Sequence, residues 1–284
     1  MGTDEIVVSP NHVVFDLPEI VAVHEGLFEA AGLAVRFADA TDRSADHERN
    51  PAARHKESQF TAAQADVYNV CEWGGIDRLE RDTRGGRIGH LRAAVVAQAL
   101  VSIDPELNEP HDLADVPLAV NLYTGSHYTA LHLLEGTVPR ERITLVHAGP
   151  PAQRLERLLG GDSRATMLME PFLSLALSRG AHVLGTYTYR GSQVVAPHLT
   201  AAQQEAYRGA VDKAVDLING DRARWAPTIA AEAGLEPALL RPDYHRYTHL
   251  VPFTERRFTE TYAWMRSWRL TDGRSGYETL RAMR

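Results

Sequence analysis

The chain has 284 residues, of which 44% are hydrophobic and 24% charged, with a formal net charge of −7. This length supports one or two hydrophobic cores. Nucleic-acid-binding proteins usually carry an excess of Lys and Arg, whereas this chain is net negative, so we expect no nucleic-acid partner. The single cysteine, Cys71, excludes an intramolecular disulfide and any multi-cysteine zinc site.

The N-terminal sequence MGTDEIVVSP bears on the compartment. A secretory signal needs a basic start and an apolar core of about 7–15 residues, and this sequence has neither. No stretch approaches the roughly 18 apolar residues of a membrane span, so we expect no membrane insertion. These features predict a cytoplasmic location. The alternative is a periplasmic or cell-surface location, if a signal sequence has been removed.

Hydrophobic periodicity predicts strands that alternate with helices. In chain order, strands are expected over residues 6–8, 33–37, 66–70, 90–101, 118–121, 143–147, 165–169 and 182–189. Helices are expected over residues 18–31, 125–134, 151–159 and 172–178 and over most of 201–284. Residues 39–56 are polar and charged, and this stretch is too long for an ordinary tight loop.

The alternation also predicts the domain organisation. Strands separated by helices require a parallel sheet with both faces covered. Two successive β-α-β-α-β blocks followed by a helical tail predict two such sheets, one in each of two lobes. We expect residues 1–95 and 190–284 to form lobe I, and residues 96–189 to form lobe II.

Four segments follow the order of motifs in a known family. Residues 25–35, EGLFEAAGLAV, are similar to its opening G-F-F-x-x-x-G-L-x-V, and residues 112–120, DLADVPLAV, are similar to its D-L-K-G-K-K-I-A-V. Gly125-Ser126 opens a helix, and Met169-Glu170-Pro171 matches an E-P that follows a strand. Over about residues 5–200 the chain thus resembles the nitrate/sulfonate/taurine-type solute-binding proteins and the related thiamine-pyrimidine-synthase family.

The resemblance implies an α/β, periplasmic-binding-protein-like fold of type II, with a ligand cleft between two lobes and a helical C-terminal tail. Two regions depart from the transport-type pattern: the charged stretch after the second strand, and the loop 71–75, CEWGG. These regions look more like the cytoplasmic enzyme offshoots of the fold, which include an aromatic sulfinate desulfinase.

Ligands of open α/β sheets bind beyond the carboxyl ends of the strands. The helix that begins near Gly125 follows such a strand end, so its start is a candidate anion site. The backbone N–H groups of a helix N-terminus bind carboxylate, sulfonate or phosphate groups. We therefore expect the turn formed by Tyr123, Thr124, Gly125, Ser126 and His127 to contact the ligand. Ser126 can equally serve as the N-cap of the helix.

Three residues after the first and third strands are candidates for catalysis. His12 is a candidate general base, although it can equally be a solvent-exposed loop histidine. Glu72 could orient His12, move a proton or bind a cationic substrate. It can equally be a surface carboxylate with no role in the site. Cys71 is a candidate nucleophile. A free cysteine is more often an inert core residue, and strand alternation predicts that Cys71 faces the core, opposite to Glu72.

Four further residues are candidate ligand contacts. Asn11 follows the first strand, and Trp73 could form a wall of the cleft and stack on a flat ligand. Glu170 could bind an amine or hydroxyl group, or cap the helix that follows it. Tyr187, with Tyr189 on the same strand face, could contact the ligand or simply pack.

The sequence predicts neither a metal site nor a cofactor. His245 and His249 have the i, i+4 spacing of a metal-binding pair, but no third ligand accompanies them. No phosphate-binding loop or dinucleotide fingerprint is present.

We therefore expect a cytoplasmic, cofactor-independent lyase or hydrolase that acts on a small anionic substrate, aromatic or heterocyclic in character. The alternative is a substrate-binding protein that delivers a sulfonate-, nitrate- or pyrimidine-like ligand to the permease of an ABC transporter.

Overall fold

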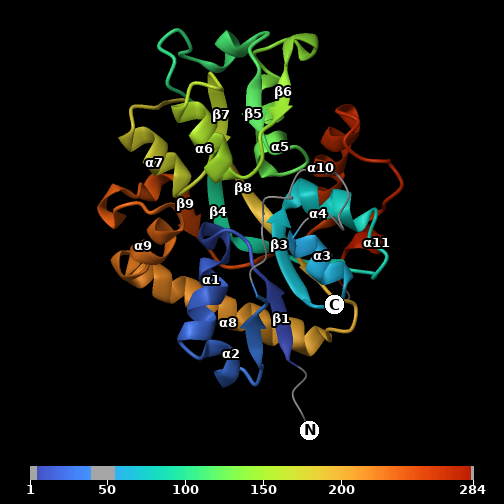
Figure 1. Ribbon diagram of the computed structural model, residues 1–284. Coiled ribbons are helices and arrows are strands. Elements are labelled where there is room, and N and C mark those ends of the chain that lie inside the picture. Colours follow the sequence, from blue (N-terminus) through green and yellow to red (C-terminus); the bar gives the residue numbers. More distant parts are fainter. Residues whose placement is uncertain (1–4, 40–54, 283–284) are drawn as a thin grey trace.

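The computed structural model describes residues 5–39 and 55–282 (Figure 1). Its strands are β1 (Ile6–Ser9), β2 (Val35–Phe37), β3 (Val67–Cys71), β4 (Arg87–Ser102), β5 (Leu118–Val120), β6 (Leu145–His147), β7 (Ala165–Leu168), β8 (His182–Val195), β9 (His245–Tyr247) and β10 (Val251–Pro252). All of them belong to one mixed sheet with the order β2-β1-β3-β8-β4-β7-β5-β6, to which β9 and β10 add by pairing with β4.

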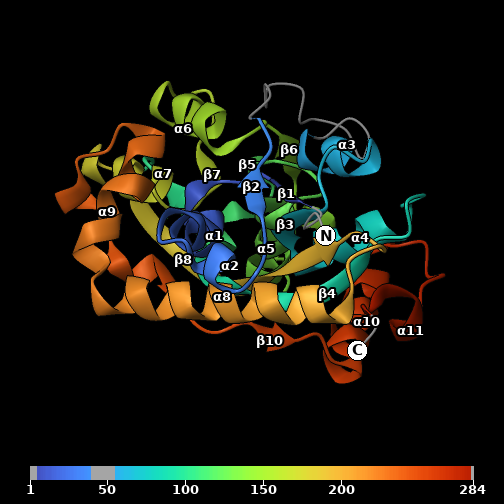
Figure 2. The same cartoon turned by 90° about the horizontal axis from the view of Figure 1, so that it is seen from below.

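Helices surround this sheet. They are α1 (Val13–His24), α2 (Leu27–Ala30), α3 (His55–Thr61), α4 (Glu72–Leu79), α5 (Gly125–Leu134), α6 (Pro151–Leu159), α7 (Phe172–Ser178), α8 (Ala201–Gly220), α9 (Arg222–Ala230), α10 (Glu255–Ser267) and α11 (Tyr277–Leu280). Short 3₁₀ turns are η2 (Pro110–Leu113), η3 (Arg140–Arg142), η4 (Ala231–Ala233), η5 (Pro237–Leu239) and η6 (Pro242–Tyr244). Seen from below, α8 crosses the molecule beside α1 and α2 (Figure 2).

Two long antiparallel strands join the two halves of the sheet. β4 has 16 residues and β8 has 14, and the two pair along their lengths. β3 pairs with the C-terminal end of β8, and β7 pairs with the C-terminal end of β4. The expectation of two separate sheets is therefore wrong, because β4 and β8 belong to both halves.

The inner strands of each half are buried, whereas the edge strands β2 and β6 are partly exposed. In Figure 1, β5–β7 with α5–α7 occupy the upper part and β1–β3 with α1, α2 and α8 the lower part. Residues 91–102 of β4 are all buried, so this strand forms part of the core along most of its length. The division into lobe I (1–95 with 190–284) and lobe II (96–189) stays a prediction.

The C-terminal region is not purely helical, contrary to expectation. β9 and β10 pair antiparallel with β4 at Ala94–Val96 and at His90–Leu91, where the β4–β8 register is irregular. Because β7 pairs with β4 only at Ala99–Ser102, the N-terminal part of that β4 edge has free hydrogen-bonding groups, and the tail supplies their partners. His245 lies in β9 and not on a helix, so His245 and His249 do not share a helical face.

A buried ion pair fastens α1 to β4. The side chain of Arg92 is 1% exposed and that of Glu19 is fully buried. Arg92 donates from both terminal nitrogens to the Glu19 carboxylate, with one contact at 2.7 Å, and it also donates to the carbonyl of Phe15 at 2.7 Å. The hydroxyl of Tyr207, from α8, lies 3.5 Å from the same carboxylate.

We expect Glu19→Gln to lower the free energy of unfolding by about 3–5 kcal/mol, because the substitution leaves Arg92 buried without a counter-charge. Urea unfolding measures this loss. The control is Glu5→Gln, which removes the exposed pair between Glu5 and Arg36 and should cost less than about 1 kcal/mol. Equal losses in the two variants would show that the buried pair does not hold α1 in place.

Candidate functional site

A cavity of about 90 Å³ lies where the loops after β1 and β3 meet the starts of α5 and α6. Its lining consists of Pro10, Asn11, His12, Phe15, Lys56, Asn69, Val70, Cys71, Arg78, Arg92, Gln98, Asn121, Thr124, Gly125, Ser126, Pro151, Arg154, Met169, Tyr189 and Gly191. Among the residues that the structure describes, the lining includes four Lys or Arg side chains and no carboxylate. The cavity is therefore suited to an anion.

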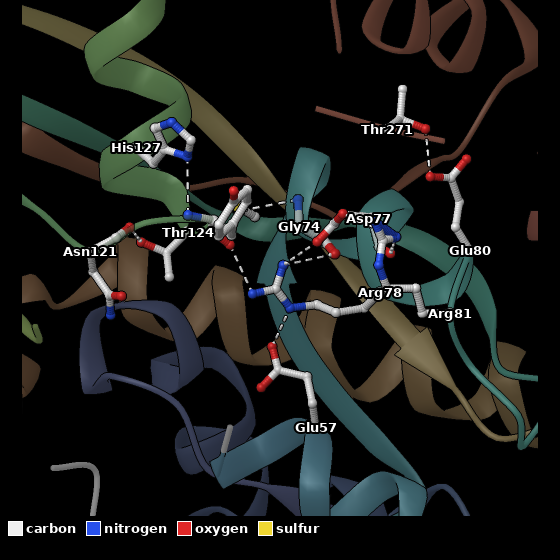
Figure 3. Close-up of polar contacts among 12 residues, drawn as sticks. Glu57, Gly74, Asp77, Arg78, Glu80, Arg81, Asn121, Thr124, His127 and Thr271 are labelled. Carbon is white, nitrogen blue, oxygen red and sulfur yellow. Dashed lines mark hydrogen bonds and ion pairs between the residues drawn. The ribbon is translucent and has the colours of Figure 1, made fainter. Parts of the chain in front are cut away.

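Two of the three arginines are neutralised by buried carboxylates. Arg92 pairs with Glu19, and the Nε of Arg78 donates to Glu57 at 2.6 Å (Figure 3). Arg78 also donates to the carbonyl of Tyr123 at 2.8 Å, which ties α4 to the turn before α5. These two arginines therefore hold the walls of the cavity together.

Arg154, in α6, is the exception. Arg154 is only 2% exposed. Its Nε donates to the carbonyl of Met167 at 2.9 Å, and its Nη1 donates to the carbonyl of Gly149 at 2.6 Å. No carboxylate among the described residues forms an ion pair with it, and burial lowers the pKa of the guanidinium to about 9. A buried cation held only by carbonyl groups retains a strong attraction for an anion.

Arg154 was not predicted from the sequence, although the spacing of the apolar residues around it indicates that it is buried. The buried residues of α6 are Pro151, Arg154, Leu155 and Leu158, which have the spacing of one apolar helix face. An arginine on such a face must be buried, and a buried arginine needs a partner. The partner could not be deduced from the spacing.

His12 lies in the cavity with a carboxylate partner, but the partner is not Glu72. His12 Nδ1 is 2.6 Å from Glu232 Oε1, and the other oxygen of Glu232 accepts from the backbone N–H of Val13 at 3.0 Å. Glu232 belongs to η4, directly after α9, and is 220 residues away in the chain. This separation explains why local sequence patterns did not indicate Glu232.

Asn11 is held rigidly beside His12. Its side chain donates to the carbonyl of Asn69 at 2.9 Å, and its backbone N–H donates to Asp16 at 2.5 Å. The other oxygen of Asp16 accepts from the Asn69 side chain at 2.6 Å. Burial, together with the charge of Glu19, raises the pKa of Asp16 to about 6.

Cys71 and Glu72 point different ways, as predicted, although Glu72 begins α4 and is not part of the strand. The expected role of Glu72 as the partner of His12 is not found. Cys71 lines the cavity, where its Sγ caps α4 by accepting from the N–H of Gly74 at 3.3 Å. Glu72 is buried outside the cavity, where it accepts from Arg257 at 2.9 Å and from Thr261 at 2.5 Å. Glu72 therefore anchors α10 and does not orient His12.

Trp73 and Tyr187 also lie outside the lining of the cavity. Trp73 is buried in a cluster of rings that also contains Tyr128, His132, Tyr187, Tyr189 and Trp264. Tyr187 stacks on His132 with ring centroids 4.6 Å apart. Because α10 covers these rings, neither residue forms the expected wall of the cleft; only Tyr189 of this cluster lines the cavity.

The turn before α5 contributes three of its five candidate residues. Thr124, Gly125 and Ser126 line the cavity, and the N-cap of α5 is Thr124 rather than Ser126. Ser126 Oγ instead accepts from the N–H of Asn121 at 2.9 Å. A side chain at position 125 would place its Cβ 2.5 Å from the Tyr189 hydroxyl, so any residue other than glycine would require the Tyr189 ring to shift.

Tyr123 and His127 stabilise this turn from outside the cavity lining. The N–H of Tyr123 donates to His127 Nδ1 at 3.0 Å, and the two rings meet edge to face. Tyr123 has a φ of 60°, in the left-handed region that non-glycine residues seldom adopt. The hydrogen bond to His127 compensates for that conformation.

Glu170 precedes α7 and hydrogen-bonds to the first turn of that helix, as its capping alternative implies. It is fully buried, and it accepts from the backbone N–H of Ser174 at 3.2 Å and from the Ser174 hydroxyl at 2.7 Å. Burial raises the pKa of Glu170 to about 7, against the opposing effect of these hydrogen bonds. Its neighbour Met169 lines the cavity, and Glu170 does not.

Solved structures resemble the chain along almost its whole length. The alkanesulfonate-binding protein SsuA from Xanthomonas axonopodis pv. citri, bound to MOPS, has a TM-score of 0.77 and 16% identity over 98% of both chains. The periplasmic aliphatic sulphonate binding protein SsuA from Escherichia coli has a TM-score of 0.75 and 14% identity, over 99% of this chain and 93% of that one. The chain has the periplasmic-binding-protein fold.

This fold also occurs in an enzyme. The desulfurization enzyme DSZB has a TM-score of 0.69 and 14% identity, over 98% of this chain and 96% of that one, and a cysteine-to-serine variant of it has been solved with biphenyl-2-sulfinic acid. No family model and no curated protein sequence matches the chain. No described helix is long and apolar enough to span a membrane.

We expect the Cys71 thiol to react slowly with iodoacetamide, because the thiolate is the reactive form and burial raises the pKa of this thiol. Mass spectrometry of the single adduct, followed against pH, measures the reaction. The midpoint of the rate profile should lie above that of glutathione. A midpoint at or below that of glutathione would instead indicate an activated nucleophile.

We expect Glu170→Gln to flatten the pH dependence of stability. The pKa of about 7 in the fold lies above the ordinary 4.5. The stabilisation is therefore complete below about pH 4.5 and is lost as the pH rises through about 7. Between about pH 5 and pH 8 the wild-type protein should lose about 2–3 kcal/mol more than the variant. Urea unfolding at each pH measures this, with the exposed Glu141→Gln as the control; parallel curves for all three proteins would contradict it.

Proposed function

We propose that the cavity binds a small organic anion and that Arg154 binds its charged end. The observation that carries this proposal is a buried guanidinium with no described carboxylate partner on the cavity wall. Lys56 adds a second positive charge to the lining, and the start of α5 adds backbone N–H groups at Gly125 and Ser126.

The remaining walls suit the organic part of such a ligand. Phe15, Met169 and Tyr189 provide apolar and aromatic contacts. Gln98 and Asn121 add amide side chains to the lining, a residue type that can hydrogen-bond with polar groups of a ligand. We therefore propose an aromatic or heterocyclic anion. The similar structures bind a sulfonate, MOPS, in one case and a sulfinate in another, which supports this choice.

We expect Arg154→Met to weaken binding of the best anion about tenfold or more, because a hydrogen bond to a charged group contributes about 1.5–3 kcal/mol. The anion is first chosen from a panel of small sulfonates, sulfinates and carboxylates by thermal shift, and its affinity is then measured by calorimetry. Arg157→Met, on the exposed face of the same helix, is the matched control and should bind normally. Unchanged affinity in Arg154→Met, or no stabilising anion in the panel, would remove the proposal.

We further propose that the bound anion is a substrate of a cofactor-independent lyase or hydrolase in the cytoplasm. The close pair of His12 and Glu232 supports this, because a carboxylate that holds one ring nitrogen orients the imidazole and fixes its tautomer, as general acid–base catalysis requires. Cys71, with a raised thiol pKa in the ligand-free cavity, is the weaker candidate for the chemistry. The alternative proposal is a substrate-binding protein for an ABC transporter, which the likeness to the SsuA proteins favours.

We expect His12→Ala to reduce turnover of the bound anion by about 10²–10⁴-fold while its affinity stays within about tenfold, because a positioned base contributes mainly to rate. Cys71→Ser should be mild in comparison. Mass spectrometry of single-turnover reactions gives the rates, and calorimetry the affinities. A large loss in Cys71→Ser with none in His12→Ala would indicate a covalent thiol mechanism. If the wild-type protein converts none of the anions that it binds, the transport alternative replaces the enzyme.

A further inference from the structure

Helix α10 connects two helices that belong to different halves of the sheet. Its first half contacts α4, which follows β3, and its last turn contacts the end of α5, which follows β5 (Figure 1). Both of these helices line the cavity, α4 with Arg78 and α5 with Gly125 and Ser126. No described residue of α10 belongs to the lining, so α10 bridges the two walls from outside the cavity.

The contact with α4 centres on a buried carboxylate. Glu72, whose side chain is 1% exposed, accepts from Arg257 Nε at 2.9 Å and from the Thr261 hydroxyl at 2.5 Å. Glu80, directly after α4, accepts from the hydroxyls of Tyr262 and Thr271. Breaking this contact would leave the charge of Glu72 buried without a partner, so α10 is firmly attached to α4.

The contact with α5 is the more exposed of the two. Glu135, directly after α5, has a side chain that is 28% exposed, and it accepts from the indole N–H groups of Trp264 at 3.0 Å and Trp268 at 2.8 Å. Arg140 is exposed; it donates to the carbonyl of Ser267 at 2.8 Å and lies 4.0 Å from the ring centroid of Trp268. Water can replace these partners, so this end of α10 is released at a lower cost than the other end.

Access to the cavity is limited because most of its lining is buried. Cys71, for example, is 8% exposed. A ligand therefore enters more readily when α5 moves away from α4. The lining residues that are partly exposed are Pro10, Asn11, His12, Lys56 and Thr124.

We propose that α10 is a latch that controls access to the cavity. It stays attached to α4, and release of Glu135 and Arg140 lets α5 move away from α4 by a hinge motion of β4 and β8, the two strands that join the halves. The hydrogen bond from Arg78 to the carbonyl of Tyr123 breaks in the same motion and forms again on closing. The inference rests on the proposed function, because it concerns entry of the ligand to that site.

Cys71 reports on the opening without any ligand, because it is the only cysteine of the sequence and it lines the cavity. The probe is Ellman's reagent, a bulky aromatic disulfide, at one fixed alkaline pH. We expect the double variant Glu135→Ala/Arg140→Ala to be labelled about tenfold or more faster than the wild-type protein, since it loses hydrogen bonds to charged groups. The matched control, Glu141→Ala/Arg157→Ala, changes the same residue types at exposed positions and should be labelled at the wild-type rate.

The urea dependence of labelling separates latch release from unfolding. Local opening exposes little surface, so the rate should change little at low urea, whereas labelling through global unfolding rises steeply. Trp268→Phe removes one indole donor and keeps an aromatic ring; it should raise the rate about threefold, and it decides the question if the double variant does not fold. Equal rates in the latch and control variants, or an increase only with the urea dependence of global unfolding, would overturn the proposal.

Ligand exchange tests the connection to function separately. For an anion that the cavity binds, with MOPS as the first probe, the double variant should raise the association and dissociation rates by a similar factor and leave Kd nearly unchanged, because opening precedes both steps. Unchanged exchange rates would overturn the role of the latch in ligand entry. If no anion binds, the proposed function fails, and the labelling rates alone decide whether α10 is a latch.

Discussion

The antiparallel pairing of β4 with β8 is the constraint on which the rest of the structure depends. These two strands are long enough to carry β3 at one end and β7 at the other. A polar loop follows β1, α4 follows β3 directly, and the starts of α5 and α6 come after β5 and β6. Because both sets of strands attach to the same pair, these loops and helix starts meet in one place, and the cavity forms there. Gly191 and Gln98, from the two long strands, line its floor.

Buried charge distinguishes the structural arginines of the cavity from the functional one. Arg92 and Arg78 each have a buried carboxylate, and each connects two elements of the fold. Removing either partner would leave a buried charge uncompensated, which explains their importance for stability. Among the described residues Arg154 has only carbonyl partners, so its charge is available to a ligand. The same physical rule thus assigns the first two arginines to the walls and the third to binding.

The C-terminal helix α10 adds a second connection across the molecule. Arg257 and Thr261 bind Glu72 of α4, while Trp264 and Trp268 both donate to Glu135, which follows α5, at 2.8–3.0 Å. The aromatic ring of Trp264 also stacks on His132, with centroids 3.7 Å apart. These contacts account for the burial of Glu72 and Trp73, which the sequence alone placed in the cleft.

Local patterns predicted much of the fold and part of the site. Periodicity placed most strands, and the rule that ligands bind beyond strand ends correctly brought Asn11, His12, Cys71 and the turn 124–126 to one cavity. It could not give the partner of His12, because Glu232 comes from the far end of the chain. It also could not show that α10 covers Trp73 and Tyr187, since a helical pattern indicates an apolar face but not what packs against it. The single continuous sheet was not predicted, because the length of β4 and β8 joins the two halves, and the alternation of strands and helices does not reveal this.

The central claim is that Arg154 meets the anionic group of the ligand in the cavity. A crystal structure of the protein grown with a bound organic sulfonate tests it most directly. The account predicts sulfonate oxygens within hydrogen-bonding distance of the Arg154 guanidinium, near the start of α5. A carboxylate of the protein itself paired with Arg154, or a sulfonate bound elsewhere, would contradict it.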